Sequence, residues 1–206
     1  MTSSNTFKDM RILNAEFVKS IVVYEEENND LLPEVCFIGR SNVGKSSMIN
    51  SLVARKIART SSTPGATKLI NIFTISYESG MVKKTVRFSD FPGFGFSRVS
   101  RAVSQSWQAM IENYILKNRK IRTIIWLFDI RRKIDELDEM LVEWLLENNL
   151  DFCVVLTKCD KETQSAIAKK KRLFDAYLKN KQVFTYSSKT GLGKKEILSY
   201  MANVIE

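Results

Sequence analysis

The 206-residue sequence contains no histidine. This absence excludes imidazole general bases and histidine-ligated zinc, so any catalysis must use carboxylates, lysine, hydroxyl groups, backbone amides or a metal. Cysteine is scarce as well: Cys36, Cys153 and Cys159 have neither the spacing of metal ligands nor that of a paired set. Two of them lie in apolar runs, where a reduced thiol packs as a small hydrophobe. This usage points to a reducing environment such as the cytoplasm.

Long apolar segments are also missing. The N-terminal stretch MTSSNTFKDMRILNAEF lacks the apolar core of a signal peptide, and no run approaches the length of about 20 residues that a membrane helix needs. We therefore expect a cytoplasmic protein with no membrane span. Hydrophobic residues still make up 44% of the chain, which is enough to bury the core of one compact domain.

Positive charge is in excess. Lysine and arginine total 32 against 23 aspartate and glutamate residues, which gives a net charge of +9. Most of the basic clusters lie in the second half of the chain, at 117–122, 131–133, 169–172, 179–181 and 194–195. This balance favours a polyanionic partner such as RNA, although charge of this size can also serve solubility alone.

The hydrophobic pattern alternates between strands and helices from residue 35 onward. An apolar run at 35–39 stops at a glycine-containing loop, and the following residues 46–54 have helical periodicity. Two β-rich segments, 69–77 and 82–88, flank a short turn and predict an antiparallel hairpin. The remaining pattern predicts strands and helices in alternation, with strands at 121–130, 151–157 and 182–187 and helices around 107–114 and at 137–145, 162–179 and 191–205.

This alternation predicts an α/β three-layer sandwich, in which a mixed, mainly parallel six-stranded sheet carries helices on both faces. Ligands in such folds bind beyond the carboxyl ends of the strands. Residues 1–30 show little pattern, so we expect a partly ordered leader there and a single domain at 31–206. One helix carries an apolar stripe that we expect to face the core, formed by Leu137, Met140, Leu141, Trp144 and Leu145.

A phosphate-binding loop follows the first apolar strand. It matches the pattern GxxxxGK[ST] at Gly39, Arg40, Ser41, Asn42, Val43, Gly44, Lys45 and Ser46. The glycines let backbone N–H groups curl around the β-phosphate, Lys45 reaches the β- and γ-phosphate oxygens, and Ser46 gives its hydroxyl to Mg²⁺. Because a strand precedes the loop and a helix follows it, we predict the fold of a P-loop NTPase.

Two later segments indicate that the base is guanine. In Thr157-Lys158-Cys159-Asp160, the Asp160 carboxylate can accept two hydrogen bonds from the N1–H and N2–H₂ edge of guanine, which adenine cannot offer. Lys158 would lay its aliphatic stem along the base. Alone, this tetrapeptide could equally be a helix cap, but one strand later comes Tyr186-Ser187-Ser188, whose backbone amides can meet the guanine O6. We therefore predict GTP and GDP as ligands, and Asp160 disfavours an ATPase.

Two segments between these motifs are predicted to respond to the γ-phosphate. In Asp90-Phe91-Pro92-Gly93, Asp90 can bind Mg²⁺ through water while the Gly93 amide senses the γ-phosphate. A strand-end aspartate could also cap the next segment, but the glycines on either side of Phe94 favour a loop built to move. Upstream, Thr67 can supply a second hydroxyl to Mg²⁺ when GTP is bound, with Thr63 as its rival. Such a segment, ordered by GTP and released by hydrolysis, is a switch.

The motifs GRSNVGKSS, TPGAT, DFPGFG, TKCD and SSKTG, in this order, resemble the EngB (YihA/YsxC) family of bacterial GTPases, part of the Era-like group. The resemblance spans about residues 16–205. It implies a role in assembly of the large ribosomal subunit, with a precursor of that subunit as partner, and a requirement for normal cell division and septation. It also implies a second switch at Asp90 to Gly93 and a first switch formed by Gly65, Ala66, Thr67, Lys68 and Leu69. Within that first switch, this chain departs from the family's common residues at Ala66 and Lys68.

Hydrolysis requires a positioned water and charge stabilisation, and we assign catalytic roles to Lys45, Thr67 and Gly93. A glutamine often follows DxxG and holds the water, but Phe94 stands here and cannot hydrogen-bond to it. We therefore predict a slow GTPase, acting as a monomeric switch, that a ribosomal partner accelerates. Asn42 either helps to hold a K⁺ near the phosphates or only stabilises the loop. The alternative function is a nucleotide-gated binding module of the division machinery with no RNA role.

Overall fold

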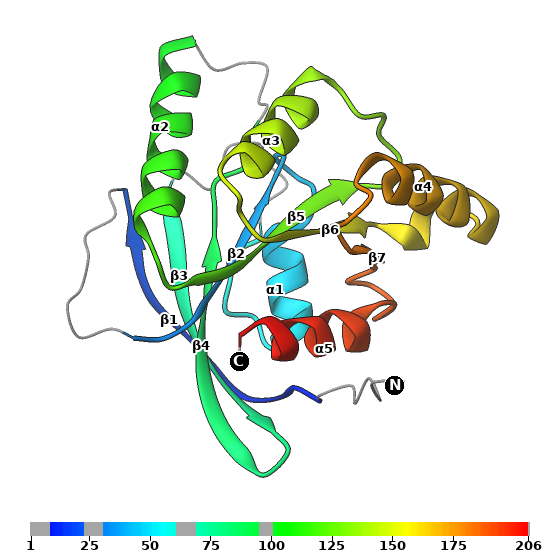
Figure 1. The fold of residues 1–206 in the computed structure, drawn as a ribbon. Coiled ribbons are helices and arrows are strands. Elements are labelled where there is room, and N and C mark those ends of the chain that lie inside the picture. The colour runs from blue at the N-terminus through cyan, green and yellow to red at the C-terminus, as the bar shows by residue number, and fades with distance from the viewer. Residues whose placement is uncertain (1–8, 23–30, 61–68, 95–100, 206) are drawn as a thin grey trace, which may run out of the picture.

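One mixed sheet forms the centre of the molecule in the computed structural model, which describes residues 9–22, 31–60, 69–94 and 101–205, with 101–108 by backbone only. The described strands follow the order β1-β3-β4-β2-β5-β6-β7 across the sheet (Figure 1). Their bounds are β1 Arg11–Ile21, β2 Glu34–Gly39, β3 Ile70–Ser79, β4 Val82–Asp90, β5 Ile121–Asp129, β6 Phe152–Thr157 and β7 Val183–Thr185.

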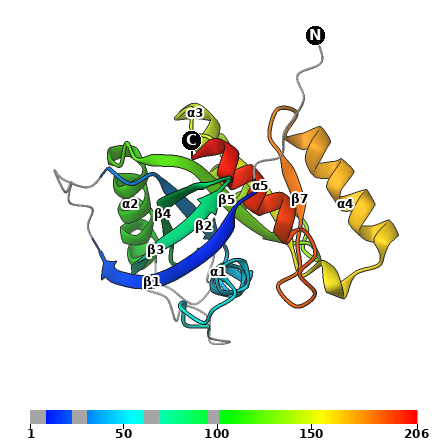
Figure 2. The ribbon, with the colours of Figure 1, turned by 90° about the horizontal axis from the view of Figure 1, so that it is seen from below.

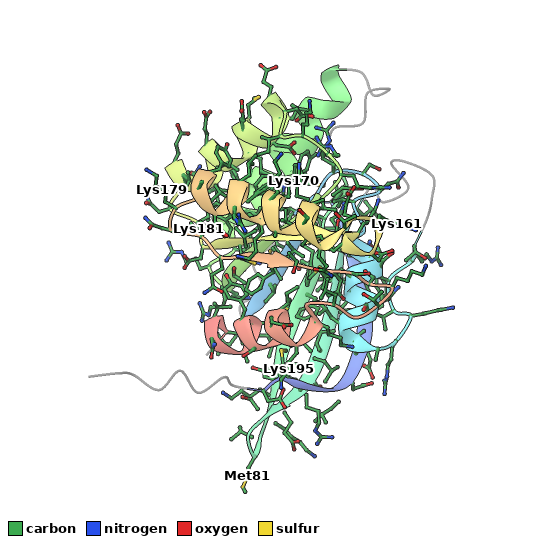
Figure 3. The ribbon with its side chains drawn as sticks, turned by 90° about the vertical axis from the view of Figure 1, so that its right-hand side faces the viewer. Met81, Lys161, Lys170, Lys179, Lys181 and Lys195 are labelled. Carbon is green, nitrogen blue, oxygen red and sulfur yellow. The ribbon has the colours of Figure 1, made fainter. Side chains whose placement is uncertain are left out.

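The sheet is parallel on one side and antiparallel on the other. Strand β2 runs parallel to β4 and β5, and β6 and β7 continue the parallel half. Strand β3 is antiparallel to β1 and β4, so the predicted hairpin is present. Gly80, with φ of 63°, lies in its turn, and the fully exposed Met81 stands at its tip, away from the body of the molecule (Figure 3).

The sheet has seven described strands, so the predicted count of six is wrong. The additional strand, β1, lies within the stretch that we expected to be a leader, and it pairs with β3 along its length. Register shifts between Ile12 and Asn14 and between Phe17 and Lys19 interrupt its alternation of buried and exposed residues. Such bulges remove the regular period of two by which a strand is recognised.

Helices cover both faces of the sheet, which makes the predicted three-layer sandwich. They are α1 Lys45–Val53, α2 Arg101–Lys117, α3 Glu136–Glu147, α4 Gln164–Tyr177 and α5 Lys194–Val204, with a 3₁₀ turn η1 at Cys159–Lys161. In β2, Val35 and Phe37 pack in the cluster that includes α1 and α5, while Cys36 and Ile38 pack with α2, α3 and α4. Within the described chain, no helix is long and apolar enough to cross a membrane.

The predicted core stripe of α3 is only partly correct. Leu145 is fully buried, but Leu137 and Met140 are 44% and 52% exposed. The helix instead turns Asp138 and Val142 inward. Asp138 receives hydrogen bonds there from an arginine side chain and from the backbone at the start of the helix, so a carboxylate occupies a position that hydrophobicity alone assigns to solvent.

Candidate nucleotide site

The predicted motif segments begin at one edge of the sheet. Strands β2, β4, β6 and β7 belong to its parallel part and end at Gly39, Asp90, Thr157 and Thr185. Parallel strands bring their carboxyl ends to the same edge, which is where ligands of α/β proteins bind. The phosphate-loop, Asp90 and guanine segments therefore lie together.

The loop after β2 has a backbone that few residues allow. Gly39 has φ of 153°, and a Cβ there would lie only 2.6 Å from the carbonyl oxygen of Leu127. Gly44, with φ of 109°, caps the N-terminus of α1, and Asn42 adopts φ of 60°. This course places the loop around the N-terminus of α1, where free backbone N–H groups and the helix dipole favour an anion.

Lys45 lies beneath the loop. Its Nζ donates to the carbonyl oxygens of Gly39 at 3.1 Å and Arg40 at 3.2 Å, and the residue is 7% exposed. Burial lowers the pKa of Lys45 to about 8, against the opposing effect of the Asp90 carboxylate. Phosphate oxygens next to Nζ would stabilise the charged form. Lys45 is therefore arranged to gain charge stabilisation from a phosphate ligand.

Ser46 and Asp90 form the polar pair expected for a metal site. The Ser46 hydroxyl donates to Asp90 Oδ2 at 2.7 Å. Asp90 is 1% exposed, and this burial raises its pKa, while Lys45 and Ser46 act in the opposite direction. The other carboxylate oxygen, Oδ1, is buried and has no hydrogen-bond partner in the described chain.

These features fit Mg²⁺. A buried carboxylate oxygen without a partner is unfavourable, and a metal-bound water would satisfy Asp90 Oδ1. The part of the chain that the structure describes holds no cluster of three histidine, cysteine or acidic ligands. Mg²⁺ does not need one, because it is commonly held by one or two carboxylates together with ligand phosphates and water.

The segment that follows Asp90 lies directly on the phosphate loop. Phe94 donates its backbone N–H to the Gly39 oxygen at 3.3 Å, and Ser41 donates its backbone N–H to the Phe94 oxygen at 3.1 Å. A Cβ on Gly93 would lie 2.5 Å from the Cα of Ser41, so only glycine permits this approach. Phe91 and Pro92, which precede Gly93, are both buried. Any displacement of this segment must therefore change its contacts with the loop.

The first segment predicted to bind guanine, Thr157 to Asp160, is hydrogen-bonded to the phosphate loop. The Thr157 hydroxyl donates to the Val43 carbonyl oxygen at 2.8 Å. Lys158, with φ of 61°, donates from Nζ to the Asn42 carbonyl oxygen at 2.6 Å and pairs with Asp129 at 3.0 Å. The side chains of Thr157 and Lys158 thus hold the predicted base-binding and phosphate-binding segments in one arrangement.

The second guanine segment positions Asp160. The Ser187 hydroxyl donates to Asp160 Oδ1 at 2.7 Å, and this hydrogen bond is the main cause that lowers the pKa of Asp160. The backbone N–H groups of Tyr186 and Ser187 are already donated to Leu156 and Leu192 oxygens. Of the three predicted residues, the exposed Ser188 is therefore the candidate for a backbone contact with the base. Cys159, also predicted as a contact, is 2% exposed, and its backbone N–H donates to the Tyr186 oxygen at 3.1 Å.

Two acidic residues that we did not predict from the sequence, Asp129 and Asp135, form ion pairs with residues of the candidate site. Burial tends to raise the pKa of Asp129, but hydrogen bonds from Arg131 and Lys158 lower it to about 2. Asp135 accepts two hydrogen bonds from Arg40, at 3.0 and 2.9 Å. Asp135 also caps α3, and its position before that helix was the only signal that could have indicated a role. The sequence offered no signal for its pairing with Arg40.

The first switch is largely outside the described residues. Gly65, Ala66, Thr67, Lys68 and the rival Thr63 all fall in the range 61–68, of which nothing is described. Leu69, at the end of the predicted segment, is 37% exposed just before β3.

Known proteins share both the sequence pattern and the fold. A family model described as 50S ribosome-binding GTPase matches residues 34–158. A probable GTP-binding protein EngB of Fusobacterium nucleatum is 43% identical over 197 residues, which cover 93% of this chain and 97% of that protein. A protein of the same description from Aquifex aeolicus is 40% identical over 173 residues, covering 83% and 90%.

Solved structures agree in fold. A crystal structure of a probable GTP-binding protein EngB matches with a TM-score of 0.63 at 24% identity, covering 84% of this chain and 98% of that chain. Era, solved with MgGDPNP and a segment of 16S ribosomal RNA, matches with a TM-score of 0.70 at 19% identity, covering 84% and 56%. From the family match and the identity to these relatives, the chain belongs to the EngB family of GTP-binding proteins and is a P-loop GTPase.

Proposed function

We propose that this chain is a GTP-dependent switch in the assembly of the large ribosomal subunit. The observation that carries the proposal is the seating of the Asp90 to Phe94 segment on the phosphate loop, through the Ser46–Asp90 and Ser41–Phe94 hydrogen bonds. A γ-phosphate beside this loop would contact the same segment. An exchange of GTP for GDP would thus change the contacts of this segment and affect the chain that follows Phe94.

The phosphates and the metal are assigned to residues on the loop and at the end of β4. Lys45 and the loop N–H groups bind the β- and γ-phosphates, and Gly93 offers its N–H to the γ-phosphate. Ser46, Asp90 and Thr67 are the proposed holders of Mg²⁺. When bound, Mg²⁺ offsets the negative charge of the β- and γ-phosphates.

The base is read by the Thr157 to Asp160 and Tyr186 to Ser188 segments. Asp160, held by Ser187 and with a lowered pKa, is ionised at neutral pH and can accept both hydrogen bonds from guanine. The stem of Lys158 lies along the base, and Ser188 is the proposed donor to O6. This assignment favours GTP over ATP.

Hydrolysis is proposed to be slow in the isolated protein. Phe94 has no side-chain group that can orient a water, and both its backbone groups are engaged with Gly39 and Ser41. A partner would therefore accelerate hydrolysis by ordering the switches or by supplying a group. K⁺ held near Asn42 is a second route, for which K⁺ should raise turnover above the rate in Na⁺. Equal rates in both salts, unchanged in Asn42→Ala, would leave Asn42 as a loop stabiliser only.

The proposed partner is a precursor of the large ribosomal subunit. The matching family is described as binding the 50S ribosome, and the net charge of +9 suits a particle rich in RNA. We further propose that the protein acts in the cytoplasm as a monomer and is needed for normal cell division and septation. These last assignments come from the family resemblance and not from the geometry of the site.

Purification of particles with the tagged, full-length protein tests the proposal. The protein is loaded with a non-hydrolysable GTP analogue or with GDP before capture, and rRNA and proteins are identified. We expect large-subunit precursors with the analogue and far fewer with GDP. Recovery of division proteins without rRNA would instead support a nucleotide-gated module of the division machinery.

A further inference from the structure

Nearly all of the net positive charge lies in one stretch of the chain. Residues 161–195 contain ten lysine and arginine residues but only two acidic residues, a net charge of +8 out of +9 for the whole chain. The rest of the sequence is therefore close to neutral. Charge that served solubility alone would have no reason to gather in one stretch.

The fold brings these charges to the β7 edge of the sheet. Helices α4 and α5 flank β7 there, at the edge opposite β1 (Figure 2). Figure 3 shows that Lys161, Lys170, Lys179, Lys181 and Lys195 are distributed over this side of the molecule. We call this surface the α4–α5 face, formed by Lys161, Lys169, Lys170, Lys171, Arg172, Lys179, Lys181, Lys189, Lys194 and Lys195.

Few of these charges are neutralised. Lys171 pairs with Asp175 at 3.0 Å, while Lys181 and Lys161 lie 3.8 and 3.9 Å from Asp151 and Asp160. Several others are exposed and form no ion pair with any described residue: Lys169, Arg172, Lys179, Lys189 and Lys195. The face therefore presents unpaired positive charge to solvent.

The residue types point to phosphate groups as the ligand. Nine of the ten basic residues are lysines. Lysine is depleted in protein–protein interfaces, and reading of base edges favours the fork of arginine, whereas the flexible ammonium of lysine suits sequence-independent contact with phosphates.

The face also lacks the stacking platform of a single-strand binder. Among residues 161–195, Tyr177 is the only exposed aromatic side chain, and the others, Phe174, Phe184 and Tyr186, are buried or partly buried. Proteins that bind single strands place aromatic rings among their basic residues. Duplex RNA is instead recognised by shape and by its phosphates, so the α4–α5 face suits a duplex.

The α4–α5 face adjoins the predicted guanine motif and lies away from the Asp90 to Phe94 segment. The η1 turn that precedes α4 contains Asp160, and Lys194 at the start of α5 donates to the Ser51 carbonyl oxygen of α1. Asp90 ends β4, which is separated from β7 by β2, β5 and β6. Within the described sheet, three strands thus lie between β4 and β7, and we expect a rearrangement next to Asp90 to leave the face unchanged.

We propose that the α4–α5 face binds the phosphate backbone of duplex RNA, independently of sequence and of whether GTP or GDP is bound. The switch segments would then add the nucleotide-dependent part of particle binding. The inference rests on the proposed function for the source of this RNA, a ribosomal particle. The RNA affinity of the face itself is separable from that role.

Binding of a labelled 20-base-pair RNA hairpin to the full chain tests the inference, measured by anisotropy at several salt concentrations with GDP and with a non-hydrolysable GTP analogue. The variant Lys169→Ala/Arg172→Ala/Lys179→Ala removes three exposed charges from the face. A matched control, Lys56→Ala/Lys83→Ala/Arg119→Ala, removes three exposed charges elsewhere.

We expect the face variant to bind RNA at least about tenfold more weakly, with the slope of log affinity against log salt reduced by about 3, and the control to change affinity by less than about twofold. Both nucleotides should give the same result. The inference would be overturned if both variants lost RNA affinity equally, or if the face variant lost none. It would also be overturned if a polyglutamate peptide of equal charge bound as tightly as the RNA.

The inference and the proposed function can fail separately. If the face variant keeps full RNA affinity while the wild type still captures precursors only with the GTP analogue, the inference fails and the function stands. If the face binds RNA as described but neither nucleotide gives capture of precursors, the proposed function fails instead.

Discussion

Arg40 of the phosphate loop makes two hydrogen bonds, at 3.0 and 2.9 Å, to Asp135, the residue that caps α3. Arg132 donates to the same carboxylate at 2.8 Å and to the buried Asp138 at 2.9 Å. The start of α3 and the phosphate loop are therefore joined through one carboxylate. Arg40 therefore helps to hold the phosphate loop against the start of α3.

Loss of this carboxylate should lower the free energy of unfolding. Asp135→Ala removes both the cap and the pairs, and we expect a loss of about 1–2 kcal/mol. Arg40→Ala should cost less than about 1 kcal/mol, because the pair is partly exposed. The double variant should be less destabilised than the sum by about 0.5 kcal/mol, measured by chemical denaturation.

A matched control is Thr163→Ala, which removes the side-chain cap of α4. Thr163→Ala should lower the free energy of unfolding by about 1 kcal/mol. Its effect should add fully to that of Arg40→Ala, because Thr163 caps α4 whereas Arg40 pairs with Asp135 at the start of α3. If Arg40→Ala and Asp135→Ala were fully additive as well, the pair would contribute nothing.

Above pH 8, the binding of a nucleotide should be accompanied by the uptake of a proton at Lys45. Burial lowers the pKa of Lys45 to about 8, and phosphates next to its Nζ should raise the pKa again. Affinity should therefore fall as pH rises past 8. Calorimetry of MgGDP binding in buffers of different ionisation enthalpy should show a proton uptake that is small at pH 7 and clearly larger at pH 8.5. No uptake at pH 8.5 would show that Lys45 is fully charged before binding.

Asp90→Asn should remove the dependence of nucleotide affinity on Mg²⁺. The wild-type protein should bind labelled GDP at least about tenfold more tightly with Mg²⁺ than with a chelator, because the unpartnered Oδ1 gains a metal-bound water. The variant should bind equally in both conditions. Ser46→Ala should weaken the same dependence, and an unchanged ratio in both variants would place the metal elsewhere.

Asp160→Asn should move the preference from guanine to xanthine nucleotides. The carboxylate accepts two hydrogen bonds from guanine, whereas an asparagine amide can donate to the O2 of xanthine. In a competition experiment, the ratio of the affinities for XDP and GDP should change by at least about a hundredfold in favour of XDP. Retained preference for GDP would mean that the base is read by other residues.

Much of the site was predictable because its chemistry depends on local sequence. Gly39 ends a buried strand and Lys45 follows it, while Asp160 lies in the turn just after another strand, so pattern and strand order together place them at one edge. The Arg40–Asp135 pair was not predictable, since it joins residues 95 positions apart without a motif. The proposal of Ser188 rather than Tyr186 or Ser187 as the donor to O6 likewise depends on backbone hydrogen bonds that no sequence pattern encodes.

Strand β1 was missed for a different reason. Its register shifts at Ile12 and Phe17 disturb the alternation, and much of the strand is exposed at the edge of the sheet. A single sequence contains too little periodic signal for such a strand, and its pairing with β3 supplies the order instead. The burial of Asp138 in α3 was also not predictable, because hydrogen bonds such as that from Arg132 stabilise it and no sequence pattern indicates them.

Single-turnover hydrolysis of GTP, measured for the full-length protein with and without purified large ribosomal subunits or their precursors, tests the central claim most directly. Because the Phe94 side chain has no hydrogen-bonding group to orient a water, we predict slow hydrolysis by the protein alone. The particles should accelerate hydrolysis at least about tenfold, and the Asp160→Asn variant should not show this acceleration with GTP. Rapid hydrolysis in isolation, or a rate that no ribosomal particle changes, would contradict a switch that waits for its partner.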